Sequence, residues 1–204
     1  MLTIENISLS LDDKVIIKEL SCSFFQCSVS LLDGANKVAN TLLLKTLAGL
    51  HKAYQGDILV QQNNILDSFE AYKNDINYIS SRDGLKLGLS VMDNIEHWAS
   101  IYETEILINT AFHFFELEEL ADSKIQDLTK EQRQRVSLTR LILKPTPIWY
   151  LDNPCLHLEE KMKKKFCNMI EVRAREGGII LINSENKDIP VVNNKINLSD
   201  FDPK

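Results

Sequence analysis

Short apolar runs alternate with longer segments of helical periodicity along this chain of 204 residues, and this order constrains the fold more than any other feature. A helix between two strands favours a parallel sheet, because the helix carries the chain back across the sheet. The sequence therefore predicts an α/β domain with a mainly parallel core sheet. The strand candidates are Ser28–Asp33, Ile76–Ile79, Ile148–Leu151 and Ile179–Ile182, and the helix candidates are 38–50, 130–143 and 158–176.

The N-terminal part of the chain has a different pattern. Residues 2–10 and 15–25 alternate apolar and polar side chains, and Asp12 and Asp13 between them favour a tight turn. This pattern predicts a hairpin, and hence an N-terminal antiparallel β portion. Ile58–Val60 is a further strand candidate.

The segment 90–125 has helical periodicity and contains no strand candidate. We expect it to form a helical lobe at about 84–126, inserted into a core lobe made of about 1–80 and 127–204. The whole chain, 1–204, is then one domain, with Ile148–Leu151 as its central strand.

The helix predicted at 38–50 has apolar residues at the spacing of a core-facing stripe. Leu43, Leu44, Leu47 and Leu50 make this stripe, and Gly49 lies where the helix should end.

Charge and hydropathy exclude several classes of protein. The chain has 23 lysines and arginines against 29 aspartates and glutamates, so its net charge is −6 and we expect no nucleic-acid partner. No apolar stretch approaches the roughly 18 residues that a membrane span needs. Glu5 interrupts the N-terminal alternation, which argues against a signal peptide and favours a cytoplasmic protein. The four histidines are scattered and suggest no metal cluster.

Asp33–Leu50 lies between a strand candidate and a helix candidate, where a phosphate-binding loop belongs. Such a loop has the form GxxxxGK[ST]. Its glycines let backbone N–H groups face the phosphates, its lysine reaches the β and γ phosphates, and its hydroxyl helps to hold Mg²⁺. Gly34 and Thr41 match this form, but Ala39 and Asn40 replace the second glycine and the lysine. The pattern by itself does not establish a phosphate loop.

Three further segments give this loop its context. They are RDGLKLGLSVMDNIEHWA at Arg82–Ala99, RVSLTRLILKPTPIWYLDNP at Arg135–Pro154 and GGIILINSEN at Gly177–Asn186. Together with the loop, and in this order, they resemble the ATP-binding subunits of ABC transporters. The Pro-x-Pro-x-Trp run before Leu151 and Asp152 is most similar to the heme-exporter subfamily of cytochrome c maturation.

The resemblance implies a P-loop NTPase-like ABC nucleotide-binding domain that uses ATP and Mg²⁺. It also implies an integral-membrane permease as partner, with docking near Arg82–Ala99, and pairing as a homodimer or with another ABC subunit. The chain would then be peripheral at the inner face of the cell membrane.

The resemblance assigns functional positions residue by residue. The positions for nucleotide are Gly34, Asn36, Lys37, Asn40, Thr41, Leu42, Arg82 and Asp152, and the signature-loop positions are Leu128, Thr129, Lys130, Glu131 and Gln132. Thr41 and Asp152 would hold Mg²⁺ if nucleotide binds. Asn153 stands at the catalytic-base position and Glu185 at the switch-histidine position.

Most of these positions depart from the family pattern. Asn40 replaces the phosphate lysine, Arg82 the Q-loop glutamine and Glu131 a signature glycine, while Asn153 and Glu185 replace the base and the switch histidine. Loss of a base removes about 10²–10⁴-fold in rate, and loss of a charged phosphate ligand removes roughly 1.5–3 kcal/mol of binding. The chain is therefore predicted to hydrolyse ATP poorly or not at all.

Three functions remain open at this stage. The first is a transporter subunit, with ATP bound weakly or used only by a partner. The second is a non-catalytic scaffold or interaction protein derived from an ABC ATPase. The third is a competent ATPase in which Lys37, three residues before Asn40, supplies the missing charge.

Overall fold

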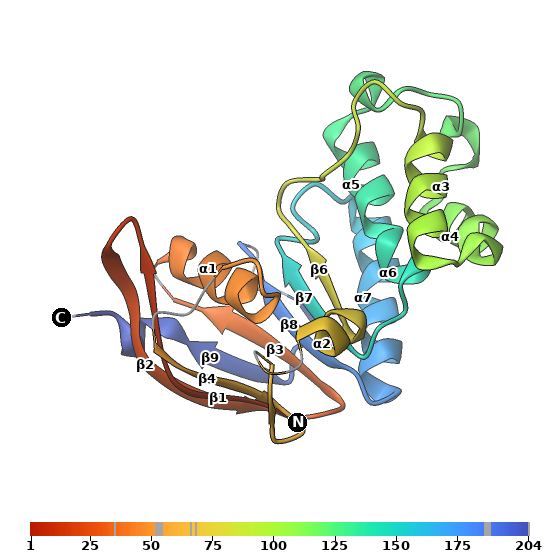
Figure 1. Ribbon diagram of the computed structural model, residues 1–204. Coiled ribbons are helices and arrows are strands. Elements are labelled where there is room, and N and C mark those ends of the chain that lie inside the picture. The colour runs from red at the N-terminus through yellow and green to blue at the C-terminus, as the bar shows by residue number, and fades with distance from the viewer. Residues whose placement is uncertain (35, 52–54, 66, 68, 186–188, 204) are drawn as a thin grey trace.

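The computed structural model describes residues 1–34, 36–51, 55–65, 67, 69–185 and 189–203, and Figure 1 shows their arrangement. Ala35 in the predicted phosphate loop and Asn186 at the end of the last matched segment lie outside the described residues. The predicted α/β class, with a parallel core sheet, an N-terminal antiparallel portion and helices, is confirmed.

The core sheet has five strands in the order β6-β7-β8-β3-β9, and all of its pairs are parallel. Its strands are β3 (Ser28–Asp33), β6 (Ile76–Ile79), β7 (Ile148–Asp152), β8 (Ile179–Asn183) and β9 (Asn194–Asn197). The prediction that Ile148–Leu151 would be central is wrong, because β8 occupies the middle place and β7 lies beside it. Strand order depends on long-range packing, which periodicity does not report.

The second sheet is antiparallel and has the order β2-β1-β4-β5. Its strands are β1 (Leu2–Leu11), β2 (Lys14–Phe24), β4 (Gln55–Val60) and β5 (Asn63–Asn64). The predicted hairpin is present, and Asp12 and Asp13 turn it with φ of 49° and 61°. In Figure 1 this sheet forms the curved outer layer, and the apolar face of α1 (Lys37–Leu47) packs in one core with residues of both sheets.

Alternate residues of the core sheet pack into two different cores. Trp149 and Leu151 of β7 belong to the core shared with the helices that follow β6, whereas Ile148 and Tyr150 pack with α1 and the antiparallel sheet. This alternation is the two-residue period of a strand, and both faces are apolar because both are covered.

Helix α1 ends earlier than predicted. Leu50 N donates to Lys45 O at 2.8 Å and Gly49 N donates to Thr46 O at 2.9 Å, which is a Schellman motif with Gly49 at φ +72°. The predicted stripe is therefore correct for Leu43, Leu44 and Leu47 and wrong for Leu50, which is 65% exposed beyond the cap.

The chain from 91 to 143 forms the helical part at the upper right of Figure 1. It contains α3 (Val91–Tyr102), α4 (Ile108–Phe115), α5 (Lys130–Leu138), α6 (Arg140–Leu143) and short 3₁₀ turns at Glu105–Leu107, Glu118–Leu120 and Ile125–Asp127. The single helix predicted at 130–143 is interrupted at Thr139, whose hydroxyl donates to Val136 O at 2.7 Å.

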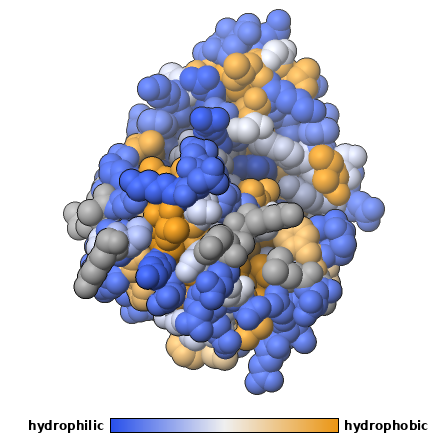
Figure 2. Space-filling model, turned by 60° about the vertical axis from the view of Figure 1, so that its left-hand side comes forward, coloured by the Kyte–Doolittle hydropathy of each residue, from blue (hydrophilic) through white to orange (hydrophobic). Residues whose placement is uncertain are grey.

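The remaining elements are α2 (Phe69–Asp75), α7 (Glu160–Arg175) and a 3₁₀ turn at Leu198–Phe201. Helix α2 and strands β5 and β9 were not predicted from the sequence. Among the described residues, no helix combines the length and the apolarity that crossing a bilayer requires. The face in Figure 2 is largely hydrophilic, with apolar side chains in small separate groups.

Candidate nucleotide site

The predicted nucleotide positions converge at the carboxyl ends of β3, β7 and β8, beside the N-terminus of α1. In open α/β sheets this edge is where ligands bind. The loop from Gly34 to Asn36 leaves β3 here, Asp152 ends β7, and Asn183 ends β8.

Asp152 is the centre of the site and is 1% exposed. Its carboxylate accepts a bond from the Thr41 hydroxyl, with distances of 3.2 Å to Oδ1 and 3.1 Å to Oδ2. Oδ1 also accepts from Asn183 Nδ2 at 2.7 Å and from Asn153 Nδ2 at 3.3 Å. A buried carboxylate requires such donors, because the loss of hydration is otherwise uncompensated. The two predicted Mg²⁺ ligands thus lie together, and each satisfies the other.

Asn183 is a site residue that was not predicted from the sequence. Its Nδ2 bonds Asp152, and its Oδ1 accepts from Asn40 Nδ2 at 3.1 Å, so it joins the loop to β7. In the sequence, the feature that could have identified Asn183 is a single polar residue at the end of the apolar run Ile179–Ile182. In the structure, all five residues of this strand are buried.

Asn40 lies where the family lysine would reach the phosphates, and it points inward. It is 4% exposed, and its Nδ2 donates to Leu32 O at 3.3 Å as well as to Asn183. Its Oδ1 is buried without a hydrogen-bond partner among the described residues. The side chain therefore presents an acceptor, where phosphate would require a donor.

Backbone donors at the start of α1 are also occupied. Asn36 caps the helix, and its Oδ1 accepts from Val38 N at 3.1 Å and Ala39 N at 3.3 Å. Asp33 Oδ1 accepts from Gly34 N at 2.7 Å. These N–H groups stand where a phosphate loop offers its own N–H groups to the ligand. An anion would have to displace the side chains that hold them.

Lys37 forms an ion pair with Glu185 across the mouth of the site. Its Nζ lies 2.8 Å from Glu185 Oε1, and the two side chains are 70% and 49% exposed. An exposed pair of this kind contributes about 0.2–1 kcal/mol. Lys37, the cation proposed to replace the missing lysine, therefore pairs with Glu185, the residue at the switch-histidine position.

Asn153 lies beside these groups with φ 53°, a left-handed conformation that asparagine tolerates better than most residues. Its Oδ1 accepts from Glu185 N at 2.9 Å, and its N donates to Asn183 O at 2.8 Å. The amide at the base position thus holds two loops together, and it cannot accept a proton from water as a carboxylate base would.

The cavity between these residues has a volume of about 60 Å³ and is lined by Gly34, Lys37, Asn40, Asn153 and Glu185 among others. Ligand sites for drug-sized molecules measure about 300–1,000 Å³. Thr41 and Asp152 retain oxygen atoms of the kind that Mg²⁺ prefers. The small volume, the inward acceptor of Asn40 and the occupied N–H groups nevertheless do not fit Mg²⁺–ATP.

Leu42, the last predicted loop residue, is 4% exposed and packs into the core around α1. Its backbone continues α1, and its side chain supports the helix from the apolar side.

Two of the five signature-loop positions, Thr129 and Gln132, cap α5. The Thr129 hydroxyl accepts from Gln132 N at 3.2 Å, and Gln132 Oε1 accepts from Thr129 N at 2.9 Å, which is a capping box. Glu131 turns back to Arg135, whose Nε lies 3.0 Å from Oε2. Leu128 is buried before the helix. Within the chain, the added carboxylate is therefore neutralised by its own helix.

Arg82 and Lys130 lie away from the phosphate cavity. Both line a separate hollow of about 400 Å³ between the segment after β6, helix α5 and the turn after β7. Gln134, which the sequence pattern does not mark as a site residue, connects this hollow to the site. Its Nε2 donates to Asn153 O at 3.0 Å and to Pro154 O at 2.7 Å.

Comparisons with known proteins agree with this architecture. A family model described as ABC transporter matches residues 17–156. The cytochrome c biogenesis ATP-binding export protein CcmA of Wolbachia pipientis is 30% identical over 89% of this chain and 88% of that protein. CcmA of Rickettsia bellii is 29% identical over 92% of this chain and 94% of that protein.

Solved structures show the same fold. An ABC transporter ATP-binding protein from Pyrococcus furiosus superposes with a TM-score of 0.82 at 24% identity, covering 99% of both chains. The ATP-binding cassette MJ0796, solved as a dimer bound to ADP and Pi, gives a TM-score of 0.83 at 19% identity over 98% of this chain and 95% of that one.

Proposed function

Because this chain belongs to the ABC transporter family, we propose that it is the ATP-binding-type subunit of a transporter that exports heme for cytochrome c biogenesis, with little or no ATP hydrolysis of its own. Support for the transported substrate comes from the relatives, which are named for export in cytochrome c biogenesis and match along most of their length. In this proposal the chain is cytoplasmic and lies at the inner face of the membrane through a permease.

The observation that carries the loss of hydrolysis is the closed network around Asp152. The Asp152 carboxylate accepts hydrogen bonds from Thr41 and Asn183, and Asn183 accepts one from Asn40. The side chain of Asn36 accepts from N–H groups at the start of α1. Phosphate binding would have to break several of these bonds, and no lysine at position 40 offsets their loss. Such groups act together, so their combined loss exceeds any single loss.

The proposed division into lobes gives the permease a groove. A hollow of about 290 Å³ lies at this boundary, and its lining includes Lys73, Tyr78 and Lys144 of the core lobe and Tyr102 of the helical lobe. The family resemblance implies that a permease helix docks between the lobes, and the segment Arg82–Ala99 begins at the boundary between them. We place the docking surface at this junction.

A second candidate function is a scaffold or interaction protein without a transport role. The observation that favours it is the same closed site, since a protein without nucleotide has no need of an open one. Association with a permease separates the two functions, because only a transporter subunit requires it.

The direct test of the nucleotide proposal is calorimetric titration of the purified chain with ATP and Mg²⁺. We expect affinity far weaker than that of an intact family member measured in the same buffer. A low-micromolar dissociation constant that the substitution Lys37→Ala abolishes would contradict the proposal and favour the competent ATPase in which Lys37 supplies the charge.

A further inference from the structure

Cys155 and Cys167 form a pair of buried thiols that the proposed function does not use. Cys155 lies in the turn after β7 and is 9% exposed, and Cys167 lies in the middle of α7 and is 5% exposed. The two side chains belong to one core and are hydrogen-bonded to each other. We propose that they form a site of reversible oxidation by hydrogen peroxide, whose product is a disulfide between the turn and the helix.

The turn that carries Cys155 is held in place by hydrogen bonds. Gln134 Nε2 donates to Asn153 O and to Pro154 O, the two residues that precede Cys155. Leu158 N donates to Cys155 O at 3.3 Å. The backbone on both sides of this cysteine is therefore fixed, and its thiol is directed into the core rather than into solvent.

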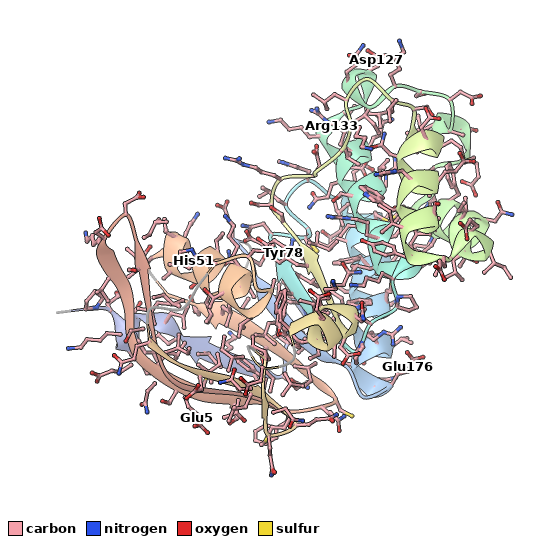
Figure 3. All side chains as sticks on the ribbon, viewed as in Figure 1. Glu5, His51, Tyr78, Asp127, Arg133 and Glu176 are labelled. Carbon is pink, nitrogen blue, oxygen red and sulfur yellow. The ribbon has the colours of Figure 1, made fainter. Side chains whose placement is uncertain are left out.

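Helix α7 fixes the second thiol. In Figure 3 its C-terminal end is marked by Glu176, and the helix runs from there toward the helical part of the molecule. At that end Lys161, in the first turn of α7, pairs with Glu116 at 3.1 Å. Phe166, which precedes Cys167, is fully buried. Because both ends of the contact are held, the two sulfur atoms remain neighbours in the folded chain.

The surroundings of the two thiols give them different roles. The hydrogen bond from Cys155 lowers the pKa of the Cys167 thiol against the effect of burial, and the Lys163 cation acts in the same direction. The same hydrogen bond and burial raise the pKa of the Cys155 thiol. Since the thiolate is the nucleophile, Cys167 reacts first and Cys155 second. Neither side chain is more than 9% exposed, so a small oxidant suits the pair better than a bulky disulfide.

The reaction has two steps. The Cys167 thiolate attacks one oxygen of hydrogen peroxide, the O–O bond breaks, and the departing hydroxide takes up the proton that Cys167 released. This step gives a sulfenic acid and water. The Cys155 sulfur then attacks the Cys167 sulfur, the S–O bond breaks, and the second hydroxide leaves as water with the proton of Cys155. The two thiols lose two electrons, and peroxide is reduced to two waters.

The other two cysteines lie elsewhere in the fold and do not compete for this bond. Cys22 is on β2 and packs against the core around α1, and burial raises its pKa to about 12. Cys27 is exposed in the turn before β3. The fold therefore selects one pairing, and a thiol reductant of the kind present in cytoplasm would reverse it.

The experiment uses the full chain with Cys22→Ser and Cys27→Ser, so that only the proposed pair remains. After exposure to hydrogen peroxide, the protein is unfolded, alkylated with iodoacetamide and mapped by mass spectrometry. We expect both thiols to be lost together, a cross-link between Cys155 and Cys167, and recovery of both thiols with dithiothreitol. The cross-linked chain should also have a higher urea midpoint than the reduced chain, because the bond restricts the unfolded state.

Matched controls in the same background are Cys155→Ser and Cys167→Ser, and neither should form the cross-link. With Cys155→Ser the sulfenic acid at Cys167 should persist and be trapped by dimedone, because the second thiol is missing. Circular dichroism checks that each variant is folded. If the doubly substituted background is not folded, the wild-type chain with its exposed Cys27 alkylated beforehand takes its place.

Two results would overturn the proposal. One is a folded chain whose Cys155 and Cys167 both remain free to alkylate after a peroxide exposure that oxidises Cys27 of the wild-type protein. The other is a cross-link that forms as fast in urea as in native buffer, since the contact in the folded chain would then contribute nothing. Both readouts are independent of nucleotide and of transport, so they do not depend on the proposed function.

Discussion

Three neutral amides meet at the candidate site. Asn40 stands where the family resemblance implies a lysine, Asn153 stands where it implies a carboxylate base, and Asn183 lies beside both at the end of β8. Each amide both donates and accepts, so the three can bond to one another and to Asp152 without any ligand. A lysine or a glutamate would lack one of these capacities. At this scale the substitutions are mutually compatible and stabilise a closed site.

The first prediction is that single repairs fail. Asn40→Lys adds the phosphate cation but removes the bonds to Leu32 and Asn183. Asn153→Glu adds a base but no held phosphate, and it places glutamate at φ 53°. Neither variant should release measurable phosphate from ATP. The double variant should improve ATP binding more than turnover, because Glu131 and Glu185 remain.

Phosphate release from the three variants, each shown to be folded, decides this prediction. A single substitution that restores ATP turnover above roughly one per minute would contradict the prediction. This rate is well below typical enzyme rates but is measurable. Such a result would mean that the remaining positions matter less than their geometry indicates.

At the scale of elements, α1 shows how one glycine determines where a helix ends. Gly49 has φ +72°, and a Cβ there would lie 2.1 Å from Phe69 Cε2. The residue thus combines a left-handed cap with close packing of the Phe69 ring. Leu50 is exposed because the chain reverses at this point.

The second prediction compares two glycines of similar conformation. Gly49→Ala should lower the free energy of unfolding by about 2–4 kcal/mol, from backbone strain plus overpacking against Phe69. Gly84→Ala, at φ +67° with nothing within 4 Å of its Cβ, should cost only the strain, about 1 kcal/mol. Urea denaturation measures both. Equal costs would show that the Phe69 ring moves away without penalty.

At the scale of the whole molecule, two hollows whose lining includes lysine or arginine side chains lie at the junction between the core and the helical part. The hollow containing Lys73 and Lys144 and the hollow containing Arg82 both open at this junction. In an acidic protein, this arrangement favours partners or ligands that are negatively charged at the point of contact.

The third prediction concerns the permease. Charge reversal at Arg82 or Lys86 should abolish co-purification of a co-expressed permease while leaving the fold intact, because both lie in Arg82–Ala99, where the family resemblance implies that the permease docks. Lys73→Glu, in the neighbouring hollow, should weaken association as well. Lys164→Glu on α7 is the matched control. Association that survives all three reversals would favour the scaffold function or a different surface.

The sequence by itself determined the layers of this protein and the position of the candidate site. Strand and helix periods are local properties, so β3, β6, β7 and β8 could be placed almost to the residue, and the loop after β3 followed from its neighbours. The substitutions at the lysine, base and switch-histidine positions could be identified for the same reason, as Asn40, Asn153 and Glu185.

Only the tertiary structure decided what those residues do. The Lys37–Glu185 pair and the Asn40–Asn183 bond join positions that are 148 and 143 residues apart, and the order of the strands that brings them together is set by packing. Helical and strand periods carry no information about such distances. The closed amide network and the hollow beside α5 therefore became visible only when the chain was folded, because each is built from side chains of separate elements.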